Sequence, residues 1–190
     1  MHRAMLVQTR DSVDIAARAR ELGCRVPVGI ALLPGNFSTA ASAGEFCFHA
    51  ATAHVRSAWQ DVGLENEGPD ARDMTGSAGH DRNSPGIPGR VPSECLISQA
   101  DTNRDSANTP LAVFFGSGLL AGPPWRLVVA LGMVSSVLAS QARRASQRGV
   151  RLNIVVERPR DHGCACIEYQ GDAFGIVALA REVRRVWTGK

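Results

Sequence analysis

The sequence predicts an α+β fold in which an apolar central helix packs on a small sheet. That sheet contains a C-terminal β-hairpin and is closed by an amphipathic C-terminal helix. Two segments, 151–156 and 164–169, alternate with the period of two that is typical of strands. Apolar residues then recur at helical spacing from Asp172 to Trp187. A nearly continuous apolar run at 127–138 is typical of a helix that is buried on every side.

The alternation also predicts which side chains face the core. The inner face of the hairpin is expected to consist of Leu152, Ile154, Val156, Ala165, Ile167 and Tyr169. The closing helix is expected to cover the sheet with Ile176, Leu179, Val183 and Trp187.

The N-terminal part, residues 1–64, is predicted to be of α/β type. A first helix is expected to be capped by Asp11 or Ser12 and to run to about Leu22, because Gly23 is a stop signal. The short apolar run 26–33 then predicts a buried strand.

A second helix is predicted at 52–62, with Gly63 as its C-terminal stop, and Ser42–Glu45 matches a capping box. Gly, Pro, Asp, Asn and Ser dominate residues 65–109, which are predicted to form a flexible or disordered insertion. Residues 110–190 supply the apolar helix and the strand–strand–helix unit, and they are expected to pack with 1–64 as a single domain.

Two apolar runs within 111–139 have two interpretations. One is a strand or short helix followed by a core helix that opens at Pro124. The other is a membrane hairpin or an interfacial segment, because Trp125-Arg126 is typical of a membrane interface. Neither run has the roughly 20 apolar residues of a spanning helix.

Charge is distributed unevenly along the chain. Residues 126–190 carry eleven basic and five acidic side chains, for a net charge of +6, whereas residues 65–125 carry −4. This excess favours an acidic partner surface, although charges outside a continuous run are also typical of solvated helix ends. The candidate interaction residues are Arg143, Arg144, Arg148, Arg184, Arg185 and Trp187. Nucleic-acid binding is not predicted, because aromatic side chains are scarce and no recognition motif is present.

One local cluster carries metal-ligand chemistry. His162, Cys164 and Cys166 could ligate a metal or form a thiol site, but they supply three of the four ligands of a structural zinc site. The sequence therefore predicts no metal and no cofactor, and it identifies no catalytic residues.

Five cysteines at irregular spacing are a poor disulfide framework. The first ten residues are polar and carry Arg3 and Arg10, so no signal peptide is predicted. A cytoplasmic location is expected, with membrane association through 111–139 as the alternative.

The layout of Leu127–Gly132, 151–156, 167–172 and the final helix resembles the effector-associated constant components of prokaryotic conflict systems. The resemblance covers roughly the last third of the chain. It implies an adaptor or interaction role and carries over no catalytic residue.

Three functional hypotheses follow. The first is a non-enzymatic interaction or adaptor protein in a bacterial conflict or regulatory system, with a protein partner or with self-association. The second is a membrane-associated regulatory protein that is anchored by 111–139. The third is a thiol- or metal-dependent protein that uses His162, Cys164 and Cys166.

Overall fold

The computed structural model describes residues 6–64, 109–145, 149–160 and 163–189. The strands are β1 (Leu6–Ser12), β2 (Ile30–Leu33), β3 (Leu111–Phe115), β4 (Val150–Glu157) and β5 (Cys164–Gly171). The α-helices are α1 (Ile15–Glu21), α2 (Thr52–Asp61), α3 (Ser117–Leu120), α4 (Pro124–Arg144) and α5 (Leu179–Thr188). Two 3₁₀ helices, η1 (Ala43–Glu45) and η3 (Ala173–Ala178), complete the described elements. The predicted α+β class is confirmed.

The five strands form one mixed sheet in the order β1-β5-β4-β3-β2. Only β3 and β4 pair in parallel, while the other neighbours are antiparallel. A parallel pair needs a crossover connection, and α3 and α4 lie in that connection. The chain therefore connects the apolar helix α4 directly to β3 and β4.

The hairpin of β4 and β5 has the predicted inner face. Leu152 lies opposite Tyr169, Ile154 opposite Ile167, and Val156 opposite Ala165. Residues directly opposite one another in an antiparallel pair share a face, and all six side chains are buried.

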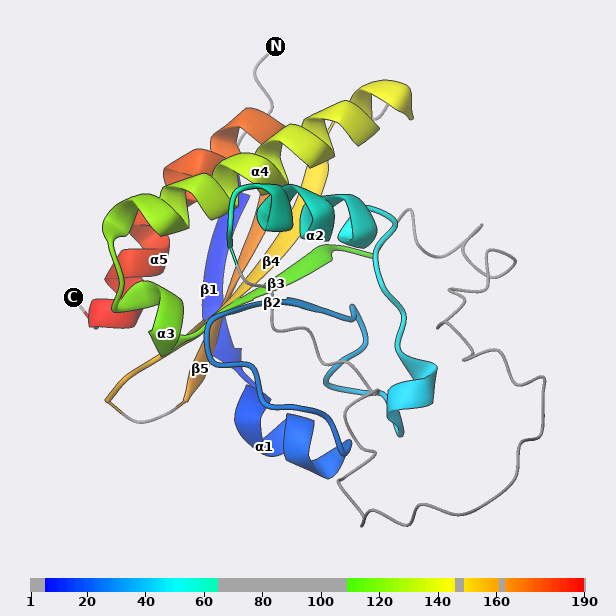
Figure 1. Cartoon of the computed structure of the whole chain (residues 1–190), viewed down its shortest axis with the longest axis vertical. Coiled ribbons are helices and arrows are strands. Elements are labelled where there is room, and N and C mark those ends of the chain that lie inside the picture. The colour runs from blue at the N-terminus through cyan, green and yellow to red at the C-terminus, as the bar shows by residue number, and fades with distance from the viewer. Residues whose placement is uncertain (1–5, 65–108, 146–148, 161–162, 190) are drawn as a thin grey trace, which may run out of the picture.

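One face of the sheet is covered by a helix layer of α2, α4, η3 and α5 (Figure 1). Trp59 of α2 is fully buried, and its indole Nε1 donates to the Ala130 carbonyl of α4 at 3.1 Å. Ser135 of α4 donates from its Oγ to the Ala173 carbonyl of η3 at 2.7 Å. These two buried bonds link α4 to its neighbours on both sides.

The opposite face of the sheet holds a smaller apolar cluster beneath α1 (Figure 1). Ile15 and Ala19 of α1 pack there with Phe114, Val155 and the cysteines of β5. This face of the sheet is thus covered at the end where β5 begins.

The N-terminal prediction was wrong in its first element. Asp11 and Ser12 do not cap a helix but end β1, and Asp14 caps α1 by accepting from the Ala17 amide at 3.0 Å. The strand β1 was missed because it lies at the edge of the sheet. Most of its side chains are exposed, so it lacks the apolar alternation that marks a half-buried strand. Gly23, with φ +66°, follows the helix as predicted.

Other boundaries differ by smaller amounts. The strand predicted at 26–33 is confined to Ile30–Leu33, since Pro27 and Gly29 precede it. The second helix ends at Asp61, and Val62 is its cap. Ser42 makes no side-chain capping bond, so the capping-box prediction was wrong and the segment forms only η1.

The closing helix begins as predicted at Asp172, whose side chain accepts from the Gly175 amide at 2.9 Å. Its first turns are the 3₁₀ helix η3, and Ile176, Leu179 and Val183 are buried. The insertion predicted at 65–109 lies outside the described residues except for Thr109.

Candidate functional site

Four large apolar side chains of the helix layer remain exposed. Trp125 and Val128 of α4 are 57% and 44% exposed, and Phe174 and Val177 of η3 are 78% and 38% exposed. We call these four residues the outer helix face. Because η3 packs against α4, the four side chains belong to one layer. Exposed apolar side chains on one layer are candidates for a docking surface.

The helical period of α4 explains why its outer side chains are left uncovered. Its buried positions are Leu127, Ala130, Leu131, Val134, Ser135 and Leu138, which form one stripe toward the sheet. Trp125 and Val128 lie off that stripe. A Cβ atom added at Gly132 would meet nothing within 4 Å, so the chain leaves open space there too. The chain itself therefore does not cover this helix on every side, and its burial in an oligomer interface or in lipid stays a prediction.

The helix α4 is long and apolar enough to cross a membrane. Of the 18-residue stretch that meets this criterion, 33% is buried within the protein. The preceding strand β3 has all five of its side chains buried. Insertion of 111–139 into a membrane would require β3 to leave the sheet and α4 to leave its packing against the sheet. Docking of the outer helix face on another surface would require neither change.

The predicted interaction arginines do not form one cluster. Arg143 and Arg144 are exposed at the C-terminal end of α4, while Arg184 and Arg185 lie near the C-terminal end of α5. The two helices run in opposite directions, so these ends lie at opposite ends of the helix layer (Figure 1). Arg148 lies outside the described residues.

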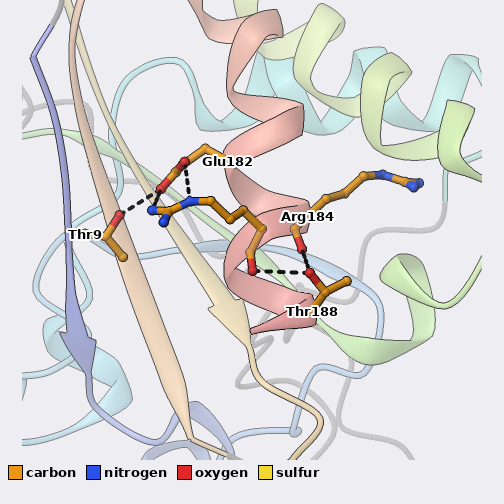
Figure 2. Close-up of polar contacts among 5 residues, drawn as sticks. Thr9, Glu182, Arg184 and Thr188 are labelled. Atoms are coloured by element: carbon orange, nitrogen blue, oxygen red, sulfur yellow. Dashed lines mark hydrogen bonds and ion pairs between the residues drawn. The ribbon is translucent and has the colours of Figure 1, made fainter. Parts of the chain in front are cut away.

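Arg185 is engaged within the chain. It donates to Glu182 through Nε at 2.9 Å and through a second guanidinium nitrogen at 2.5 Å. These bonds, more than that from Thr9, hold the pKa of Glu182 below its ordinary value. Thr9 Oγ1 of β1 donates to Glu182 at 3.3 Å, whereas the Arg184 side chain extends away from this group (Figure 2). Of this pair, Arg184 lies outside the Glu182 group but is half-buried, whereas Arg185 is exposed and bound to Glu182.

Trp187 is half-buried and packs against the helix-side core. Its indole Nε1 is buried and has no hydrogen-bond acceptor among the described residues. Its placement makes it chiefly a packing residue.

The cysteines of β5, which we call the β5 thiols, lie on the other side of the sheet. Cys164 and Cys166 are both buried beneath α1, and burial raises the pKa of each thiol. The neutral thiol is a poor nucleophile and metal ligand. His162 lies outside the described residues, and within the described part of the chain no group of three or more His, Cys, Asp or Glu could hold a metal ion.

A polar hollow of about 380 Å³ lies on the face of the sheet opposite the helix layer. It is lined by Leu6, Gln8, Arg10, Pro110, Arg151, Asn153, Glu168, Tyr169 and Gln170. Arg10 forms an ion pair with Glu168 at 2.5 Å, so these two charges largely neutralise each other. The hollow supplies amide and guanidinium hydrogen-bonding groups but no nucleophile beside a base.

Sequence reasoning identified the arginines but missed the outer helix face as a unit. Phe174 was the available signal, because it lies off the core positions Ile176, Leu179 and Val183.

A comparison with protein-family models finds no matching family, and searches of the curated proteins and of the solved structures find no match.

Proposed function

We propose that this protein is a non-enzymatic interaction module that docks on its partner through the outer helix face. The observation that carries the proposal is the exposure of Trp125, Val128, Phe174 and Val177 on a layer whose inner side is fully packed. Tryptophan, tyrosine and arginine are the side chains that most often dominate docking energies, and Trp125 is one of them. The adaptor role implied by the resemblance is one form of this proposal.

Docking predicts that the outer helix face is covered in the cell and open in the isolated protein. A Phe174→Cys variant reports this through its rate of labelling by a water-soluble maleimide. The background carries Cys47→Ser, because Cys47 is exposed, and Cys95→Ser. Leu6→Cys serves as the matched control, since Leu6 is 50% exposed on the other face of the sheet.

We expect position 174 to be labelled more slowly in the native host cells than in the purified protein, while position 6 is labelled alike in both. If the purified protein is a monomer, equal labelling of position 174 in the two settings would contradict the proposal. Docking between copies of this chain would protect position 174 in the purified protein as well, and it is tested separately.

Self-association is the form of docking that the apolar helix first suggested. Leu131 is unsuitable for testing it, because this side chain is fully buried against the sheet and its replacement by Asp would unfold the protein. Phe174→Ser changes the exposed face instead. If copies of this chain dock on one another, light scattering should show an oligomer that Phe174→Ser converts to a monomer.

A further inference from the structure

We propose that the partner of the outer helix face is an anionic lipid bilayer. This inference rests on the proposed function, because it names the partner of the same surface. It differs from an anchor at 111–139, since the helix layer stays folded on the sheet and only its outer side meets lipid.

The charge of the helix layer is the first support. The elements α4, η3 and α5 carry one glutamate, Glu182, and six arginines, namely Arg126, Arg143, Arg144, Arg181, Arg184 and Arg185. Glu182 is bound to Arg185, which leaves these three elements strongly positive, while α2 adds one arginine and one aspartate, Arg56 and Asp61. A partner that meets this surface must therefore carry negative charge.

The spacing of the arginines is the second support. Arg126 and Arg143 lie near opposite ends of α4, about 25 Å apart at 1.5 Å per residue. Charges in physiological salt are screened beyond about 8 Å. A compact anion or a short acidic segment would therefore meet one end of the layer only. A plane of negative charge meets both ends at once.

The exposed aromatic rings are the third support. Trp125 lies beside Arg126 at the start of α4, and Phe174 is the most exposed large apolar side chain of the described residues. A tryptophan ring and an arginine favour the headgroup region of a bilayer, and apolar rings between basic residues are typical of surfaces that bind there. A protruding Phe174 needs a shaped pocket on a protein, whereas a bilayer accepts it without one.

The buried contacts of α4 favour docking over insertion. The Trp59 indole and the Ser135 hydroxyl hold α4 to α2 and η3 through its inner and lateral sides. A spanning helix would give up both bonds in exchange for lipid, where hydrogen bonds lost by buried groups are costly.

The test is flotation of the full-length protein with two kinds of vesicle, one of phosphatidylcholine alone and one with about 30% phosphatidylglycerol. We expect binding to the anionic vesicles, release by about 0.5 M salt, and little binding to the neutral ones. With brominated lipid, the fluorescence of Trp125 should be quenched more strongly than that of the buried Trp59 and the half-buried Trp187. The Trp125→Phe variant should therefore lose most of the quenching.

Two variants and one control separate the contribution of charge to vesicle binding from that of apolar contact. Arg143→Glu with Arg144→Glu should weaken binding at least about 25-fold, at about fivefold for each arginine lost. Phe174→Ser should weaken it about tenfold or more. Leu6→Ser, which changes an exposed apolar side chain on the opposite face, should leave binding unchanged. Circular dichroism confirms that each variant is folded.

Absence of vesicle binding, equal binding to neutral and anionic vesicles, or binding unaffected by the arginine changes would each overturn the lipid proposal. Retention on vesicles after a carbonate wash, with release by detergent alone, would instead indicate an inserted helix and overturn it too. If position 174 is nevertheless protected in cells while vesicles are not bound, the docking module stands and its partner is a protein. If position 174 is unprotected, the proposed function itself fails.

Discussion

Two alanine substitutions one turn apart in α4 should change stability in opposite directions. Ser135 and Gly132 are both small residues of the same helix, but their surroundings differ. The Ser135 hydroxyl is buried and donates to the Ala173 carbonyl at 2.7 Å. Gly132 has open space where its Cβ would be. The pair therefore separates the effect of a buried contact from that of helix propensity.

The magnitudes follow from these surroundings. Removing the Ser135 hydroxyl costs about 1–2 kcal/mol for a buried hydrogen bond, offset by about 0.5 kcal/mol of better helix propensity. Ser135→Ala should therefore lower the free energy of unfolding by about 1 kcal/mol. Gly132→Ala meets no clash and should raise it by about 1 kcal/mol, since glycine is the poorer helix former.

Equilibrium unfolding in urea, followed by far-ultraviolet circular dichroism, measures both changes against the unmodified protein. The two variants should differ by about 2 kcal/mol, which is well outside the error of the extrapolation when the slopes agree. A destabilised Gly132→Ala would refute the open space at that position. A neutral or stabilised Ser135→Ala would refute a net contribution of the bond to η3.

Three further outcomes are expected. Trp59→Phe should lower the free energy of unfolding by about 2–3 kcal/mol, because it removes the bond to Ala130 and leaves a void in a fully buried position. The protein should lose stability as the pH falls below about 6.5, because burial lowers the pKa of His49 and the unfolded chain then binds more protons than the folded one. Since His49 Nδ1 accepts from an amide at the start of α2, the loss should be about 1 kcal/mol. The β5 thiols should react with iodoacetamide about tenfold or more slowly than Cys47, because they are buried and their pKa values are raised.

Each outcome has a direct check. Trp59→Phe is read from the same urea curves, and a change below about 0.5 kcal/mol would contradict the packing of α2 on α4. For His49, the melting temperature is measured between pH 7.5 and about 5 for the unmodified protein and for His49→Gln. The melting temperature should fall less steeply with pH in the variant. The same pH dependence in both proteins would mean that groups other than His49 cause the loss of stability. Peptide mass mapping after timed alkylation measures the reaction rate of each cysteine. Equal rates for the β5 thiols and Cys47 would contradict the burial of the β5 thiols.

The elements that could be predicted from sequence are those whose signal is local. The hairpin and the closing helix carry their own periodicity, and Asp172 marks the helix start by bonding its own first turn. The strand β1 could not be predicted in this way. Its residues Leu6–Ser12 are mostly polar and exposed, and they become a strand only because β5 offers them an edge.

The candidate site also has features that local sequence patterns predict and features that they do not. Arg143 and Arg184 were recognisable from composition, but their separation follows from the antiparallel packing of α4 and α5, which no local pattern encodes. Phe174 was recognisable as an apolar residue. Its exposure depends on η3 turning its other side, with Ile176, toward the core.

The pairing of β1 with β5 also constrains the order in which the chain can assemble. During synthesis the first strand leaves the ribosome long before Cys164–Gly171 exists, and the Thr9–Glu182 bond joins residues 173 positions apart. Contacts this distant in sequence close slowly, because the loop between them must first lose its freedom. The nascent chain therefore carries an unpaired first strand until β5 has been made, and a ribosome stalled before β5 would release a protein with an open edge on β4.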